Sequence, residues 1–187
     1  MKLLQLLPIG DVDLRALEQL GPPLAQHFHV AWDIVLPALD PQFAYHAERQ
    51  QYHSTELLAR MHGYLGPECW RLLGITSHDL YIPILTFVFG EAQMAGPAAV
   101  VSTHRLRQEF YGLAPDHNLH GERLLKEAVH ELGHTLDLRH CEDYRCAMAA
   151  SHAVEWIDLK ESGLCTACSE RTAPLLPRQK KVRVSWF

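Results

Sequence analysis

The sequence predicts an α/β fold in one domain that spans residues 1–187. A chain of 187 residues is long enough to bury one hydrophobic core without the help of disulfides. Short apolar runs of strand length alternate with segments of helical periodicity, a pattern typical of helices that pack on a sheet. No run approaches the roughly twenty apolar residues that a membrane-spanning helix needs, so we expect no membrane segment.

The first two thirds of the chain supply most of the expected elements. Residues 2–9 predict a buried strand instead of a secretory segment, because the apolar run is too short for one. Residues 12–20 predict a helix that Asp11 caps and that the Gly-Pro-Pro at residues 21–23 stops. The other expected elements are strands at 27–35, 70–76, 86–93 and 98–105, the last two as a hairpin, a polar loop or irregular helix at 37–51, and a helix at 54–63 capped by Ser54.

The stretch HELGHTLDLRHC, which begins at His130, carries the motif with the clearest chemistry. We expect Asn118 to cap the helix that holds its first half. His130 and His134 project from one face of that helix about one turn apart, which suits two imidazoles that bind one zinc. Glu131 lies between them and off the ligand axis, where a general base for a water molecule must stand. We therefore expect an exposed carboxylate in a cleft, with no cationic partner at helical spacing.

His140, six residues after His134, is the expected third ligand. On a continuous helix His140 would lie about 15 Å along the axis from His130, at about 1.5 Å per residue, beyond the reach of a shared metal. The helix must therefore end between His134 and His140. Such a sharp turn needs a left-handed residue, and Asp137 can adopt that conformation at modest cost because its short side chain can hydrogen-bond to local backbone.

Four cysteines follow directly, in two pairs: Cys141 with Cys146 and Cys165 with Cys168. This spacing is typical of four thiolates that close a tetrahedral structural zinc, and disulfide pairing is the alternative. A closed site of this kind holds the fold and does no chemistry. Because Cys141 directly follows His140, the second zinc would also hold the turn that presents the third histidine.

Other polar or sulfur-containing residues near these motifs have simpler interpretations. Met148, two residues after Cys146, either forms an apolar floor beneath the histidines or is an ordinary core methionine. Cys69 is the fifth cysteine, and its apolar neighbours predict a buried structural thiol. The residues expected at the surface or in support of the site, and not as ligands, are Asp116, His120, Glu127 and His152.

The whole pattern resembles that of the archaemetzincins, a branch of the metzincin zinc metalloproteases. The resemblance rests on HExxH, a histidine six residues later, the cysteine directly after it, CxM and the closing CxxC. It extends more loosely through the strand-like runs TFVFGEAQ and AAVVSTHRLR. Asp137 replaces the family glycine, and the sixteen residues between Met148 and Cys165 are one fewer than in the family pattern.

The resemblance implies a twisted mixed five-stranded sheet with one antiparallel edge strand, a long zinc-binding helix and a C-terminal four-cysteine zinc knuckle. Residues 1–140 would carry the sheet and the active-site helix, and residues 141–187 the zinc-knuckle subdomain. The edge strand, which we assign to residues 86–93, would bound the cleft and bind an extended peptide through main-chain hydrogen bonds. The chain would hold two zinc ions, one catalytic and one structural.

The charge and the cysteine content of the chain indicate which classes of partner and which cellular compartment to expect. The net charge of −5 argues against a nucleic-acid binder, whose surface should be broadly basic. The absence of a disulfide framework favours a reducing compartment, so we expect a cytoplasmic protein. We also expect a monomer. The closing RQKKVRVSWF clusters four basic residues, which predict a solvated tail, with a docking or nucleic-acid contact as the alternative.

Three hypotheses of different classes remain at this stage. The first is a zinc peptidase in which Glu131 moves a proton from water to the leaving amine. The second is a zinc protein that uses the same site to bind peptides without hydrolysing them. The third is a nucleic-acid module built on the four-cysteine knuckle, which the acidic balance and the dedicated Glu131 disfavour.

Overall fold

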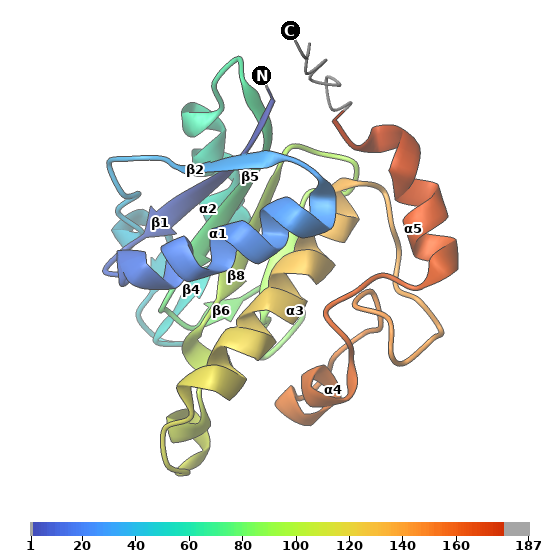
Figure 1. The fold of residues 1–187 in the computed structure, drawn as a ribbon. Coiled ribbons are helices and arrows are strands. Elements are labelled where there is room, and N and C mark those ends of the chain that lie inside the picture. The colour runs from blue at the N-terminus through green and yellow to red at the C-terminus, as the bar shows by residue number, and fades with distance from the viewer. Residues whose placement is uncertain (1, 178–187) are drawn as a thin grey trace, which may run out of the picture.

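A computed structural model describes residues 2–177 of the chain, and Figure 1 shows their arrangement. The basic stretch RQKKVRVSWF, for which the sequence predicts a solvated tail, lies outside the described residues. Within residues 2–177, none of the helices has the length and apolar character needed to cross a bilayer.

A five-stranded sheet in the order β2-β1-β5-β8-β7 forms the centre of the fold. Neighbouring strands pair in parallel, except that β7 runs antiparallel to β8 at one edge. This confirms the predicted mixed sheet with one antiparallel edge strand. The strands are β1 (Leu3–Ile9), β2 (Ala31–Ile34), β5 (Cys69–Thr76), β7 (Gly90–Ala92) and β8 (Ala98–Ser102).

Helices cover both faces of this sheet. In Figure 1, α1 and α3 lie side by side on one face, and α2 lies on the other. Because side chains alternate along a strand, β8 directs Ala99 and Val101 into the core beneath α1 and α3, and Ala98 and Val100 into the core beneath α2. The three helices that cover the two faces are α1 (Leu14–Phe28), α2 (Ser54–Met61) and α3 (His117–Thr135).

The first helix is longer than predicted. The Gly-Pro-Pro at residues 21–23 does not stop it, and α1 continues through Pro22 and Pro23 to Phe28. The cap is Asp13, whose carboxylate accepts from the Arg15 N–H at 3.0 Å, and not Asp11. Burial of Leu24 and Phe28 against the sheet explains the continuation, because core packing can outweigh the lost helix hydrogen bonds. The strand predicted at residues 27–35 shortens accordingly to Ala31–Ile34.

The predicted caps of the other two helices also shift by one or two residues. Asp116, and not Asn118, caps α3, and its carboxylate accepts from the Leu119 N–H at 2.9 Å. His53 stands at the cap position of α2, so Ser54 is the first helical residue. The Ser54 hydroxyl instead donates to the Tyr81 carbonyl at 3.1 Å, which ties α2 to the neighbouring strand.

The edge of the sheet is shorter than the predicted strand at residues 86–93. Only Gly90–Ala92 form β7, because the preceding Val88 N–H donates to the Leu80 carbonyl at 2.9 Å and leaves the main sheet. Leu80 belongs to a small second sheet in the order β3-β4-β6. The first strand of this sheet and the start of the second fall within residues 37–51, which were predicted as a polar loop or irregular helix, and the third strand lies later in the chain. The strands of this sheet are β3 (Tyr45–His46), β4 (Gln51–His53) and β6 (Leu80–Tyr81).

The segment after α3 packs beside the carboxyl-terminal half of that helix (Figure 1). It consists mainly of loops, with two short helices, α4 (Val154–Leu159) and α5 (Thr166–Thr172). Of the short 3₁₀ turns, only Ala173–Leu175 lies in this segment, and the others lie before α3, at Gln42–Ala44, His62–Tyr64, His104–Leu106 and Gln108–Tyr111. The loops of the segment carry the third histidine and three of the four clustered cysteines, so they complete both candidate metal centres.

Candidate metal centres and catalytic cleft

The three predicted histidines meet at the end of α3. His130 and His134 project from one face of the helix, and their Nε2 atoms lie 3.1 Å apart. His140 arrives from the loop, and one ring nitrogen from each of the three side chains lies within 4.8 Å of the others. Two nitrogens bound tetrahedrally to one zinc at about 2.05 Å would lie about 3.4 Å apart, so this spacing suits a shared ion.

The turn that brings His140 back is closed by the predicted left-handed residue. Asp137 has a φ of 62°. The N–H of Asp137 donates to the His134 carbonyl at 3.0 Å, and the N–H of Leu138 donates to the Gly133 carbonyl at 3.1 Å. This pair of bonds is the Schellman arrangement that ends a helix and reverses the chain. The helix therefore ends between His134 and His140, as the spacing of the histidines requires.

Backbone carbonyls fix the orientation of two imidazoles. The Nδ1–H of His130 donates to the Ala147 carbonyl at 2.8 Å, and that of His134 donates to the Leu138 carbonyl at 2.7 Å. Each bond places the proton on Nδ1 and leaves Nε2 with a lone pair for a metal. Burial lowers the pKa of His130, His134 and His140, which favours the neutral form that a metal requires. The donor set thus fits Zn²⁺.

Glu131 lies in the same cleft but is buried, so the predicted exposed carboxylate is wrong. Its exposed fraction is 5 %, and its carboxylate makes no hydrogen bond or ion pair with any residue in the described range 2–177. Burial, followed by the neighbouring Glu127 carboxylate, raises the pKa of Glu131 well above its usual range. A divalent cation at the histidines would oppose this shift, because it favours the ionised carboxylate.

Gly90 of the edge strand makes room for Glu131. A β-carbon at Gly90 would lie 2.7 Å from the Cγ and from a carboxylate oxygen of Glu131, and 2.7 Å from the Val100 carbonyl oxygen. Any side chain at position 90 would therefore displace either the carboxylate or the pairing of β7 with β8. The sequence predicted a strand that includes Gly90, but it gave no signal for the contact with Glu131, because the two residues lie far apart in sequence.

A cavity of about 430 Å³ connects these groups. Residues 85–92 form one wall, and α3 contributes Glu127, His130, Glu131 and His134 to its floor. Residues 150–152 close the side next to His140. His152, predicted as a surface or supporting residue, is exposed and lines this cavity. The edge strand β7, Glu131 and the three histidines therefore line one cavity.

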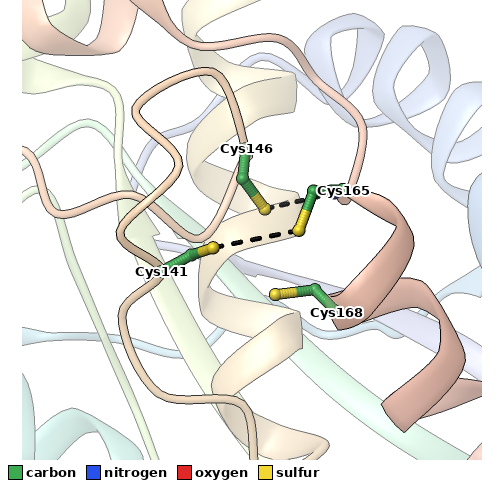
Figure 2. Close-up of side chains that lie close together, drawn as sticks. All are labelled: Cys141, Cys146, Cys165 and Cys168. Carbon is green, nitrogen blue, oxygen red and sulfur yellow. Dashed lines mark hydrogen bonds between the residues drawn. The ribbon is translucent and has the colours of Figure 1, made fainter.

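The four cysteines converge as predicted, in a cluster beside the end of α3. Figure 2 shows the side chains of Cys141, Cys146, Cys165 and Cys168 directed toward a common centre. The sulfurs of Cys141 and Cys165 are 3.8 Å apart, far beyond a disulfide bond, and all four thiols are free. Two sulfurs bound tetrahedrally to one zinc at about 2.3 Å would lie about 3.8 Å apart, so the cluster fits Zn²⁺.

Met148 lies between the two clusters. Its side chain is fully buried together with Cys146 and Cys168, and its carbonyl accepts from the Cys141 N–H at 2.9 Å. A β-carbon at Gly133, between the two helical histidines, would lie 2.2 Å from the Met148 sulfur. Close packing of Met148 against α3 therefore depends on glycine at this position. The thioether lies against the helix that carries His130 and His134, where an apolar floor was predicted.

Cys69 differs from its predicted environment, whereas Glu127 has one of the two positions predicted for it. Cys69 is only half-buried, and burial raises the pKa of its thiol to about 11. Glu127 was expected either at the surface or in support of the site, and it has the second position, because its buried carboxylate pairs with Lys160 at 2.8 Å and lines the cavity. Because Glu127 lies four residues before Glu131 on the same helix, the sequence alone could have placed it on the side that faces the cleft. Lys160 offered no local signal, because it meets Glu127 only in the folded chain.

Replacing Asp137 with glycine is expected to stabilise the protein slightly. Glycine adopts a positive φ without strain, so we expect a gain of at most about 1 kcal/mol, offset in part by the greater entropy of the unfolded chain. The melting temperature should rise by up to about 4 °C with unchanged zinc content. Arg139→Gly is the matched control, since it adds glycine at an exposed position of the same turn where φ is not positive. A fall in melting temperature for Asp137→Gly would contradict the strain argument.

Comparisons with known proteins agree with this geometry. The model of peptidase family M54 matches residues 44–173. The archaemetzincin of Methanocaldococcus jannaschii is 40% identical over 166 residues, which cover 88% of this chain and 89% of that protein. The crystal structure of the Methanopyrus kandleri archaemetzincin superposes with a TM-score of 0.82 at 35% identity, covering 93% of this chain and 94% of that one.

A second solved structure gives the same result. The archaemetzincin of Archaeoglobus fulgidus, crystallised in complex with malonate, superposes with a TM-score of 0.78 at 38% identity, covering 91% of this chain and 99% of that one. A family model matches most of the chain, and the relatives align over nearly their whole length, so both comparisons indicate the same family. The chain belongs to peptidase family M54, the archaemetzincins, and is a zinc metallopeptidase.

Proposed function

We propose that His130, His134 and His140 hold the catalytic zinc and that Glu131 is the general base for hydrolysis of a peptide bond. One observation carries the proposal. Three imidazoles converge with two Nε2 lone pairs fixed by backbone carbonyls, and the only carboxylate between the first two ligands faces the same cavity without a protein partner. A peptidase of this family must place a proton acceptor beside its metal, and Glu131 satisfies that need.

In the proposed reaction, each protein group has a defined task. When bound, the zinc supplies Lewis acidity that polarises the scissile carbonyl and makes water a stronger nucleophile at neutral pH. A carboxylate oxygen of Glu131 takes a proton from the attacking water as the new carbon–oxygen bond forms. The same oxygen then gives the proton to the leaving amine nitrogen as the carbon–nitrogen bond breaks. Burial of Glu131 keeps bulk water from competing for that proton.

We further propose that the substrate peptide binds in an extended conformation beside β7. As the edge strand, β7 pairs with β8 on one side only, and its residues line the cavity that contains Glu131. An added strand would gain main-chain hydrogen bonds whatever its sequence, while the cavity walls would select its side chains. β7 also contacts α3, so the unpaired edge lies next to the helix that carries Glu131.

The cysteine cluster is proposed as a second, structural zinc site. Four sulfur ligands leave no open position, so this ion would stabilise residues 141–177 and perform no chemistry. The division into residues 1–140 and a zinc-knuckle subdomain at 141–187 within one domain rests on the same proposal. A cytoplasmic location and a monomeric state stay predictions of the sequence.

Protein purified without a chelator is expected to contain two zinc ions per chain. A chelator should remove the ion of the histidine site first, because that site has an open position, whereas the closed thiolate site resists attack until the fold opens. Metal analysis by mass spectrometry during chelation measures both the total and the order of loss. His140→Ala is the matched variant and should hold one ion that resists the chelator. One ion or none in the unmodified protein would refute the two-site proposal.

A further inference from the structure

Lys160 is a buried charged side chain near the proposed catalytic centre. It follows α4, its side chain is 1 % exposed, and its ammonium pairs with the Glu127 carboxylate at 2.8 Å. The ammonium also donates to the Ala149 carbonyl at 3.1 Å and to the Ala147 carbonyl at 3.3 Å. Its three donors therefore meet three acceptors, one from α3 and two from the loop that contains Met148.

One of these acceptors is shared with a proposed zinc ligand. The Ala147 carbonyl accepts both from Lys160 and from the Nδ1–H of His130, at 2.8 Å for the imidazole. That carbonyl sets the tautomer and the ring orientation of His130. Any group that fixes this carbonyl therefore acts indirectly on the orientation of His130. Residues that hydrogen-bond to the partner of a metal ligand can change metal affinity in this way.

The position of Lys160 is itself fixed by the loops of the cysteine cluster. The Ala147 N–H donates to the Gly163 carbonyl at 2.9 Å, and the Glu161 N–H donates to the Arg145 carbonyl at 2.8 Å. Residues 161–163 therefore run beside residues 145–147, and the Cys165 N–H that follows donates to the Cys146 sulfur at 3.3 Å. The loop that carries Cys146 therefore also carries the Ala147 carbonyl, to which both Lys160 and His130 donate.

Stability alone does not explain a lysine at this place. Moving two charges out of water costs several kcal/mol per ion, and uncharged residues of similar volume often replace a buried ion pair without loss of stability. A lysine and a glutamate nevertheless form a buried pair close to His130 and Glu131. The ammonium differs from an apolar side chain in one relevant respect, because it can hold the Ala147 and Ala149 carbonyls in fixed directions.

We propose that Lys160 is a positioning residue that fixes the Ala147 carbonyl and thereby holds the His130 imidazole in the orientation that binds zinc. The inference rests on the proposed role of the histidines. It extends that role by assigning to the buried ion pair a function in metal affinity. Lys160 does not touch the substrate or the zinc in this proposal.

The test compares zinc affinity at the histidine site in three variants, measured by competition with a chromogenic chelator. Glu127→Gln keeps an acceptor for Lys160 and both of its carbonyl contacts, so zinc affinity should stay within about threefold of the unmodified protein. Glu127→Gln combined with Lys160→Met leaves no unpaired buried charge but removes the ammonium. Its zinc affinity should fall by about tenfold or more, as is typical when a partner of a metal ligand is lost. Lys126→Met removes a half-buried lysine of α3, whose ammonium donates to the Asp158 carbonyl at 3.3 Å and makes no hydrogen bond to Ala147 or Ala149, and it should leave the affinity unchanged.

Equal zinc affinity in the unmodified protein and the double variant would overturn the inference, as would an equal loss in Glu127→Gln alone. If the double variant does not fold, Lys160→Gln decides in its place. Its shorter neutral amide cannot reach both carbonyls, so its affinity should fall by at least threefold, and unchanged affinity would overturn the inference. If the unmodified protein binds no zinc at the histidines, the proposed function itself fails, which separates the two results.

Discussion

Glu131→Gln is expected to lower kcat/KM for peptide hydrolysis by about 100-fold or more while both zinc ions remain bound. Glutamine has the same shape as glutamate, so the packing against Gly90 survives, but the amide cannot accept the proton of the attacking water. Zinc content should not change, because Glu131 is not a member of the histidine cluster. Kinetics with a peptide substrate, together with metal analysis of the same sample, measure both quantities.

The stability of Glu131→Gln gives a further check. A buried carboxylate without a hydrogen-bond partner is costly to keep ionised, so its neutral isostere should melt at the same temperature as the unmodified protein or above it. Glu122→Gln is the matched control on the exposed side of the same helix, and it should leave both hydrolysis and melting temperature unchanged. Hydrolysis by Glu131→Gln at the unmodified rate would show that the proposed base is wrong.

Cys165→Ser is expected to unfold residues 141–177 and to release both zinc ions. A structural zinc contributes about 10–16 kcal/mol of binding free energy in small metal-dependent domains, which is comparable to the whole stability of a protein domain. Loss of one thiolate would free the loop that begins at Cys141. His140 is the residue directly before it, so the histidine site would lose its third ligand. Zinc analysis and hydrogen exchange over residues 141–177 would measure both effects.

Cys69→Ser is the matched control for this result. The chemical change is identical, and Cys69 is also half-buried, but it lies in β5 outside the cysteine cluster. We expect it to keep both zinc ions and the exchange protection of residues 141–177. A soluble Cys165→Ser protein that carries two zinc ions and protects this segment fully would contradict the structural role of the cluster.

Local sequence features were sufficient to predict that three histidines come together and that a turn separates the second from the third. Two histidines one helical turn apart must share a face, and a third histidine six residues later can join them only if the helix ends. The structure has that end, with the left-handed residue at Asp137. The cysteine cluster was equally accessible, because the spacing within each pair determines how closely its two sulfurs can approach.

The features that sequence reasoning missed depend on tertiary packing. The prolines at positions 22 and 23 predicted a helix end, but burial of Leu24 and Phe28 carries α1 past them. The strand predicted at residues 86–93 is reduced to Gly90–Ala92, because Val88 bonds to a second sheet that the sequence pattern did not reveal. Burial of Glu131 and the pairing of Glu127 with Lys160 required the folded chain, since residues distant in sequence surround them.

Peptide cleavage measured while zinc is returned to protein stripped only at the histidine site is the most direct test of the account. The starting protein, which retains the ion of the cysteine cluster, should cleave nothing. Cleavage of a diverse peptide pool should then rise in proportion to added zinc and stop rising at two ions per chain. Cleavage at the full rate with one ion, or no cleavage of any peptide with two ions bound, would contradict the assignment of the three histidines as the catalytic centre.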